Sequence, residues 1–339
     1  SRLRSSLKQP MTSTKRTYAQ AILDGFEYLL SHHDDVVAIG QGVWSPWYVG
    51  SSMSDLDKKF GKDRVIDTPV SEWATTSAAV GAALNGLRPI VIHPRMDFMI
   101  LATDSLVNQA AKWNHMLGGQ ASPALTVRGI VNRGGEQGAQ HSQALHSWYS
   151  HVPGLRVVMP ATVADARDLL IAATLSPDPV LYVDDRWLYD QTAELGAPVE
   201  TRLSGIGNQS LREGSDVTLA GSSWATLLNL QAADMLSAQG IAAEVVDCRI
   251  LNPFDRAPLV QSVSRTGRLV ATDGSWATCG MSAEIVASAS EGVPFGAWKA
   301  APARITLPDA PAPTSGPLEK AYYPTAEQVA ETARRMVTA

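Results

Sequence analysis

Short apolar runs alternate with longer segments of helical spacing along the first half of the chain. The runs are rich in Val, Ile and Leu, which is typical of strands buried on both faces of a sheet. Strands are predicted at 36–40, 88–92, 125–127, 156–159 and 180–183, and helices at 17–33, 71–86, 99–116, 141–150 and 164–175. This order predicts an α/β domain with a doubly wound parallel sheet.

The pattern fades between residues 189 and 215, where Gly, Pro, Asn and charged residues dominate. We interpret this stretch as a linker. A second alternation follows, with strands predicted at 216–220, 243–247 and 268–272, helices at 225–239, 255–264, 281–290 and 325–337, and a proline-rich loop at 308–317. The sequence therefore predicts two α/β domains, at 15–188 and 216–339.

Residues 1–14 are basic and contain no acid. They lack the apolar core of a secretory signal. A vector-derived leader before Met11 and the remnant of a transit peptide both fit this composition. We predict a disordered leader here and leave it out of the fold.

Charge and composition exclude several classes of function. The net charge of −5 and the pI near 5.8 argue against a nucleic-acid-binding protein. No apolar run reaches the roughly 18 residues of a membrane-spanning helix. Cys248 and Cys279 form no disulfide-rich or C-x-x-C pattern, which indicates a reducing compartment. We expect a cytoplasmic protein, or one of the mitochondrial matrix if the source is eukaryotic.

The first candidate for chemistry is Glu72, which follows the turn Thr68-Pro69-Val70-Ser71 and precedes an Ala-rich helix. A purely structural interpretation makes Ser71 the helix cap and places the acid at the positive end of the helix dipole. On this stretch alone that interpretation competes with a catalytic one.

The motifs in the rest of the sequence favour a catalytic role for Glu72. T-P-V-S-E at 68–72 is followed by A-V-G-A-A-L-N-G-L-R-P-I at 79–90, Q-H-S-Q at 140–143 and H-V-P-G-L-R-V-V-M-P at 151–160. From about residue 17 to 337 the chain resembles the β subunits of the decarboxylating components of thiamine-diphosphate-dependent 2-oxo acid dehydrogenases (pyruvate dehydrogenase β-like), in the transketolase-like superfamily. The resemblance implies a pyrimidine-binding domain followed by a transketolase C-terminal-like domain.

The resemblance also implies roles for single residues. Glu72 would hydrogen-bond the aminopyrimidine of thiamine diphosphate and promote formation of the carbon nucleophile, Phe98 would lie beside that ring, and Gln41 would take a cofactor-facing position. His141 would act on the substrate carboxylate or the covalent intermediate. His115 would fall near the active site.

Two segments depart from the family. Gln41 stands where many relatives carry an acid, and His93-Pro94-Arg95-Met96-Asp97 replaces an apolar lining. Arg95 would bind a substrate carboxylate or phosphate, or else pair with Asp97 or a partner chain. His93 is a further substrate candidate. These changes favour a specialised acyl or ketol transfer over ordinary pyruvate chemistry.

Metal ions are expected from the resemblance in two places. Relatives hold a monovalent cation in a loop that corresponds to Ala173, Thr174, Ser176 and Asp178, which makes potassium a candidate ligand. The G-D-G and asparagine motif that anchors magnesium and the diphosphate is absent. A separate α-type chain would therefore supply most magnesium ligands.

We thus expect a partner α-type chain and a second β subunit in a heterotetramer. One hypothesis is a specialised two-chain transferase that moves an acyl or ketol unit to an aldehyde or sugar. A second is a 2-oxo acid dehydrogenase β subunit that passes acyl groups to a lipoyl acyltransferase. A third is a non-catalytic scaffold, against which Glu72 and His141 argue.

Overall fold

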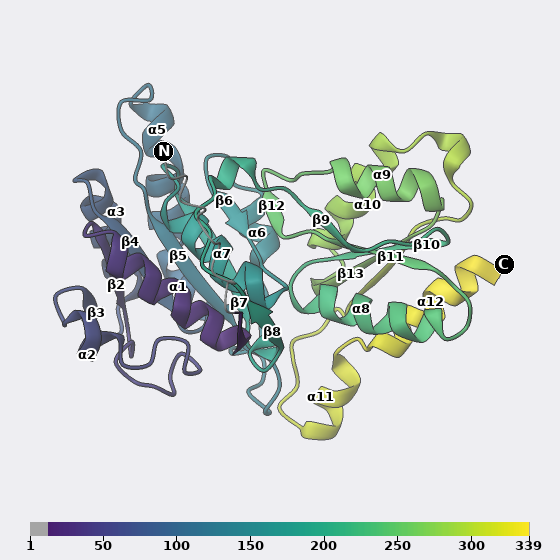
Figure 1. The fold of residues 1–339 in the computed structure, drawn as a ribbon, viewed down its shortest axis with the longest axis horizontal. Coiled ribbons are helices and arrows are strands. Elements are labelled where there is room, and N and C mark those ends of the chain that lie inside the picture. Colours follow the sequence, from purple (N-terminus) through teal and green to yellow (C-terminus); the bar gives the residue numbers. More distant parts are fainter. Residues whose placement is uncertain (1–12, 339) are drawn as a thin grey trace, which may run out of the picture.

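The computed structural model describes residues 13–338, which fold into two α/β halves that lie side by side (Figure 1). Most of the predicted leader lies outside the described residues, but Thr14 already belongs to a strand. That strand, β1 (Thr14–Thr17), pairs antiparallel with β8 (Thr192–Leu195). The start of the chain is therefore joined to the segment that leaves the first half.

The first half is built on a seven-stranded sheet in the order β12-β6-β7-β5-β4-β2-β3. The strands are β2 (Val36–Gly40), β3 (Val65–Asp67), β4 (Arg88–His93), β5 (Thr126–Val131), β6 (Arg156–Val158), β7 (Val180–Asp185) and β12 (Ile250–Asn252). All pair in parallel except β12, an antiparallel edge strand contributed by the second half of the chain. The predicted doubly wound parallel sheet is confirmed.

Helices cover both faces of this sheet. They are α1 (Tyr18–His32), α2 (Leu56–Phe60), α3 (Glu72–Leu84), α4 (Met96–Met99), α5 (Ala111–Met116), α6 (His146–Ser150) and α7 (Val163–Thr174). Side chains alternate along β4, where Ile90 and Ile92 join the core under α1 and α7 while Val91 joins the core on the opposite face. This period of two is what a strand buried on both faces requires.

The second half has a five-stranded sheet in the order β14-β13-β10-β11-β9. Its strands are β9 (Gln209–Arg212), β10 (Val217–Gly221), β11 (Ala243–Asp247), β13 (Leu269–Trp276) and β14 (Ala303–Leu307), and only β9 is antiparallel. Its helices are α8 (Trp224–Ser237), α9 (Ala257–Thr266), α10 (Met281–Gly292), α11 (Gly316–Tyr322) and α12 (Ala326–Thr338). Within residues 13–338 no helix combines the length and apolar character needed to span a bilayer.

Three predicted elements differ from the structure. The helix expected at 99–116 begins at Met96 and is interrupted by a 3-10 turn and by a π-helical segment, Ser105–Ala110. The helix expected at 141–150 is confined to α6, because Asp97 binds the backbone N–H of Gln143 and holds the preceding residues in a loop. The stretch at 189–215, expected to be irregular, contains the short strands β8 and β9.

Candidate active site

The candidate residues collect at one edge of the first sheet, where the parallel strands end. Glu72 follows β3, Arg95 and Phe98 follow β4, and His141 lies in the loop after β5. Because neighbouring parallel strands end at the same edge, residues distant in sequence meet there. The edge at the carboxyl ends of the strands is where open α/β sheets bind ligands.

Glu72 is the first residue of α3 and is only 7% exposed. It forms no ion pair with the residues that the structure describes. The preceding Ser71 makes no side-chain capping bond, so the interpretation of this stretch as an ordinary capped helix start is wrong in that detail. Its carboxylate oxygens are not among the fully buried side-chain atoms that lack a partner, so they keep access to the strand-end edge. The arrangement suits an acid whose partner is a bound ligand.

Phe98 and His141 are brought together from different segments. Their ring centroids are 5.3 Å apart with an interplanar angle of 76°, an edge-to-face contact. Both side chains are half-buried, so each keeps a surface toward this edge. The contact holds the imidazole beside an aromatic ring.

The loop that carries His141 is anchored by Asp97. Its Oδ1 accepts hydrogen bonds from the backbone N–H and from Nε2 of Gln143, both at 3.1 Å. Burial raises the pKa of Asp97, and its Oδ2 is buried without a hydrogen-bond partner. The suggested pair between Arg95 and Asp97 does not form, because Arg95 donates instead to Gln137.

The remaining predicted residues are more scattered. Gln41 is half-buried in the turn after β2 and donates from Nε2 to the Tyr48 hydroxyl at 3.1 Å. His93 is buried, with Nε2 3.1 Å from the Thr76 hydroxyl, and burial lowers its pKa to about 4. It is therefore neutral at physiological pH and faces α3. His115 is exposed near the end of α5.

The loop proposed for potassium is already bound by an arginine. Arg88 Nη1 donates to the carbonyl oxygens of Thr174 and Ser176, both at 3.1 Å. The Asp178 carboxylate accepts from Arg156 Nε at 2.7 Å, and Ala173 is buried in α7. Protein guanidinium groups thus engage the oxygens expected to bind the cation, and these residues as arranged do not fit a potassium site.

The described residues contain no group of three or more His, Cys, Asp or Glu side chains that could hold a metal ion such as magnesium. Sequence reasoning missed two residues at this edge, Gln137 and Arg186. Arg186 comes directly after the acids that end β7, and its position after a strand was the signal available.

Comparison with known proteins supports the same architecture. Residues 14–191 match the family model "Transketolase, pyrimidine binding domain", and residues 208–329 match "Transketolase, C-terminal domain". The chain is 38% identical over 322 residues to "Pyruvate dehydrogenase E1 component subunit beta-2, mitochondrial" from Oryza sativa subsp. japonica, covering 94% of this chain and 85% of the relative.

Two further relatives widen the picture. The chain is 39% identical over 273 residues to "Acetoin:2,6-dichlorophenolindophenol oxidoreductase subunit beta" from Cupriavidus necator, covering 80% of each. A solved structure titled "Split gene transketolase, inactive beta4 tetramer" matches with a TM-score of 0.74 at 22% identity, covering 95% of this chain and 98% of that one. At that identity the second likeness establishes the fold alone.

Proposed function

Because the chain belongs to the family of pyruvate dehydrogenase E1-type β subunits, with transketolase pyrimidine-binding and C-terminal domains, we propose that it is the β chain of a two-chain thiamine-diphosphate enzyme. The enzyme forms an acyl or ketol unit from a 2-oxo acid or a ketose and transfers it to an acceptor. When bound, thiamine diphosphate supplies the carbon nucleophile and the electron sink for this chemistry.

The observation that carries the proposal is Glu72, a largely buried residue at the strand-end edge of the first sheet whose carboxylate forms no ion pair within residues 13–338. Glu72 would hydrogen-bond a ring nitrogen of the cofactor's aminopyrimidine, Phe98 would lie beside that ring, and Gln41 would face the cofactor from the turn after β2. His141, held by the Asp97–Gln143 contact, donates a hydrogen bond to the substrate carboxylate or to the reacting oxygen.

An α-type chain completes the site. It brings the magnesium ligands and the diphosphate cradle that the described residues lack. Large apolar side chains near the strand-end edge are exposed, including Trp47 at 81%, Val70 at 73% and Trp73 at 58%. Exposed apolar surface of this kind marks protein interfaces, which supports a partner chain at this edge.

Substitution of Glu72 tests the proposal. In the complex co-expressed with the α-type chain, Glu72→Gln is expected to lower kcat at least about 100-fold, the usual range for lost acid–base catalysis. The exposed Glu194 provides a matched control, since Glu194→Gln removes the same charge far from the site. Size-exclusion chromatography verifies assembly. Near-normal turnover of assembled Glu72→Gln would contradict the proposal.

The acceptor separates two versions of this function. The polar residues Gln41 and Arg95 at the strand-end edge favour a specialised transfer to an aldehyde or sugar. The names of the relatives favour a dehydrogenase branch that passes acyl groups to a lipoyl acyltransferase. A screen of 2-oxo acids and ketoses with and without a lipoyl acceptor decides between them, because only the dehydrogenase branch requires the lipoyl group.

A further inference from the structure

A small cavity of about 230 Å³ opens beside the proposed active site. Its lining comes from the ends of three strands and consists of Ser45, Trp47 and Tyr48 after β2, Pro94 and Arg95 after β4, and Arg186 after β7. The volume is several times the roughly 30 Å³ of one water molecule. A phosphate or carboxylate group with a few carbon atoms fits in this space.

Two guanidinium groups meet in this cavity without an acid to balance them. Arg95 donates to the side-chain oxygen of Gln137, and Arg186 donates to the backbone oxygen of Tyr48. Both partners are neutral, and neither arginine forms an ion pair within residues 13–338. The Nε atom of Arg186 is buried and has no hydrogen-bond partner. Burial, together with the nearby Arg95, lowers the pKa of Arg186.

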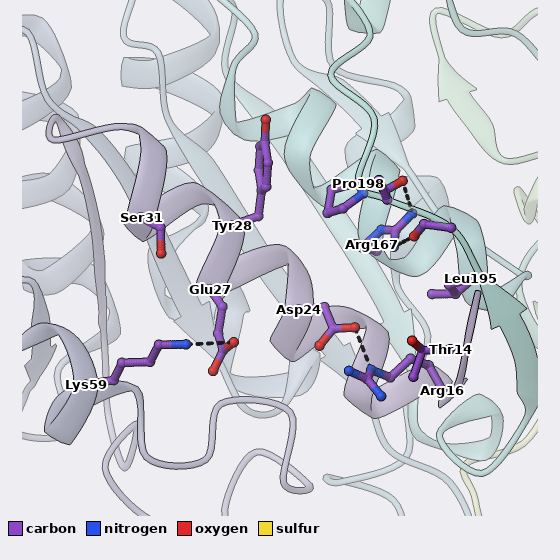
Figure 2. Close-up of a pocket in the computed structure, with 12 residues that line it drawn as sticks. Thr14, Arg16, Asp24, Glu27, Tyr28, Ser31, Lys59, Arg167, Leu195 and Pro198 are labelled. Atoms are coloured by element: carbon purple, nitrogen blue, oxygen red, sulfur yellow. Dashed lines mark hydrogen bonds and ion pairs between the residues drawn. The ribbon is translucent and has the colours of Figure 1, made fainter. Parts of the chain in front are cut away.

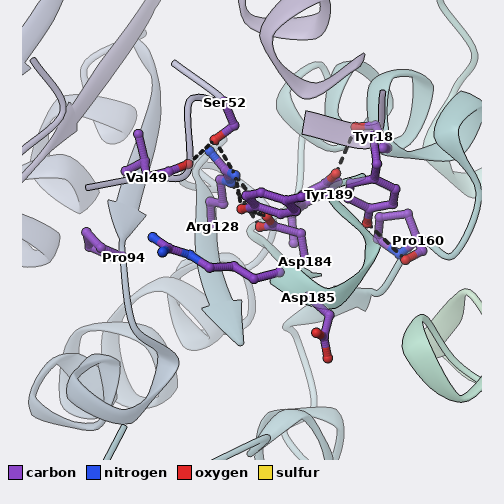
Figure 3. A network of polar contacts seen from close by, with 12 residues as sticks. Tyr18, Val49, Ser52, Pro94, Arg128, Pro160, Asp184, Asp185 and Tyr189 are labelled. Atoms are coloured by element: carbon purple, nitrogen blue, oxygen red, sulfur yellow. Dashed lines mark hydrogen bonds and ion pairs between the residues drawn. The ribbon is translucent and has the colours of Figure 1, made fainter. Parts of the chain in front are cut away.

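The two acids that directly precede Arg186 in the sequence are already occupied, and the nearer one, Asp185, accepts from Arg133 Nε at 2.7 Å. Asp184 accepts two hydrogen bonds from Arg128, at 2.9 and 2.8 Å, and a third from the Tyr189 hydroxyl at 2.5 Å (Figure 3). Arg128 and Asp184 are both fully buried. The Asp184 carboxylate is therefore paired with Arg128, and it forms no ion pair with Arg186.

A second cavity of about 510 Å³ shows the opposite arrangement. There Arg16 pairs with Asp24 at 2.8 Å and Lys59 pairs with Glu27 at 2.9 Å, along the outer side of α1 (Figure 2). Charges in that cavity are balanced within the chain. The cavity at the strand-end edge differs in that its lining contains two arginines and no acid.

We propose that Arg95 and Arg186 form a subsite for the anionic end of the substrate, a phosphate or second carboxylate remote from the reacting carbonyl. This rests on the proposed function. The planar guanidinium forks match the geometry of either anion. Tyr48 lines the subsite, and its hydroxyl accepts a hydrogen bond from Gln41, the residue proposed to face the cofactor. Arg95 also lies on the same short segment as Phe98.

Substrate pairs in the α–β complex test the subsite. A ketose phosphate is compared with the free ketose, and a 2-oxo acid carrying a second carboxylate is compared with its uncharged analogue. Arg95→Gln and Arg186→Gln are each expected to lower kcat/KM for the preferred anionic substrate by about ten- to a hundredfold, the value of a charge-assisted hydrogen bond. The loss should appear mainly in KM, and the preference over the uncharged analogue should shrink by the same factor.

Controls separate this inference from the function on which it rests. Arg202→Gln removes a positive charge from an exposed position and should keep the anionic preference, while Arg186→Lys should restore part of it. Isothermal titration with inorganic phosphate provides a readout independent of turnover, with binding expected in the wild-type complex and lost in Arg186→Gln.

If Glu72→Gln abolishes turnover but both arginine variants keep the full preference and bind phosphate, the subsite is wrong and the proposed function stands. If Glu72→Gln is fully active, the proposed function is wrong, and loss of phosphate binding in Arg186→Gln still identifies the anion site.

Discussion

At the scale of single residues, Arg128 is a fully buried charged side chain of β5, in the centre of the first sheet. Its guanidinium donates to Asp184, to the Ser52 hydroxyl at 2.8 Å and to the Tyr189 hydroxyl at 2.9 Å. Ser52 in turn donates to the Val49 carbonyl at 2.6 Å. The network thus joins strands β5 and β7 to the long loop that follows β2.

Removing the counter-ion from this network should destabilise the fold. Asp184→Asn leaves the Arg128 charge buried without an acid, and we expect the free energy of unfolding in urea to fall by about 3–5 kcal/mol. Asp234→Asn is the matched control, because Asp234 pairs with Arg212 at the surface with 79% of its side chain exposed. The control should unfold at nearly the wild-type urea concentration. Equal midpoints for the two variants would contradict this account.

The site residues differ in how far sequence alone could place them. Glu72 and His141 were predicted from sequence motifs that resemble those of a known family, and both residues follow strands of the first sheet, at its carboxyl-end edge. His93 and Arg95 stand only two positions apart, yet His93 is buried against Thr76 while Arg95 lines the small cavity. β4 ends at His93 and the chain turns at Pro94, so the strand period of two no longer applies to Arg95, and the sequence alone did not place that end.

At the scale of elements, β9 shows how a segment without a strong pattern becomes ordered. The side chain of Gln209 donates to Asp165 in α7 at 2.9 Å and to Asp247 in β11 at 3.4 Å. Arg249 also donates to Asp165, at 2.6 Å. Pairing with β11 and these polar contacts fix the strand, whereas its own residues, Gln-Ser-Leu-Arg, carry only a weak strand signal.

This cluster should make stability depend on pH. Burial, together with the nearby Asp165, raises the pKa of Asp247 from an ordinary value near 3.8 to about 7. A group whose pKa is raised by folding stabilises the protein fully at low pH and loses that contribution as the pH rises through its folded value. We therefore expect the free energy of unfolding to decline between about pH 4 and pH 7 and to level off above that, by at most about 1.4 kcal/mol per pH unit from this group.

Comparison with Asp247→Asn isolates the effect. The variant lacks the titrating group, so the difference in unfolding free energy between wild type and variant should change with pH in favour of the variant as the pH rises. Urea titrations at pH 5, 6, 7 and 8 measure this difference, while groups shared by both proteins cancel. A difference that stays constant over this range would show that Asp247 does not titrate there.

The interrupted helix between Met96 and Met116 illustrates another limit at this scale. Apolar periodicity predicted one continuous helix, but the chain forms α4, a 3-10 turn, a π-helical segment and α5 in succession. Ser105 in the π-helical segment bonds Ser77 of α3 at 2.8 Å. Packing against a neighbouring helix, rather than local propensity, selects this irregular path.

At the scale of the whole molecule, the two halves share one apolar core. The core on one face of the first sheet includes Val91 and Val127 from the first half together with Val246, Leu259 and Ile285 from the second. Arg133 spans the boundary, since its Nε donates to Asp185 at 2.7 Å and its Nη1 to the Gly274 carbonyl at 2.8 Å. The second half therefore supports the sheet whose edge carries the site.

Assembly should decide whether the cofactor binds. In the proposed function Glu72 and Phe98 would face the pyrimidine, and the described residues contain no group of three or more His, Cys, Asp or Glu side chains that could hold the metal of the diphosphate. We expect the isolated chain to bind thiamine diphosphate with magnesium at least about 100-fold more weakly than the α–β complex, because it lacks the charge-assisted contacts to the diphosphate. Isothermal titration of both samples checks this. Equal affinity would mean that the chain holds the whole cofactor by itself.

The sequence by itself determined the two α/β domains and the order of most buried strands along the chain, because these depend on local periodicity, and its short contiguous motifs singled out Glu72 and His141 as candidates. Only the tertiary structure decided that Arg88 occupies the oxygens of the expected cation loop, that Asp97 anchors Gln143 rather than Arg95, and that Arg186 joins Arg95. Those contacts join residues from separate strands, and their geometry follows from how the sheet brings strand ends together. The number of residues between two positions in the sequence does not give their distance in the folded protein.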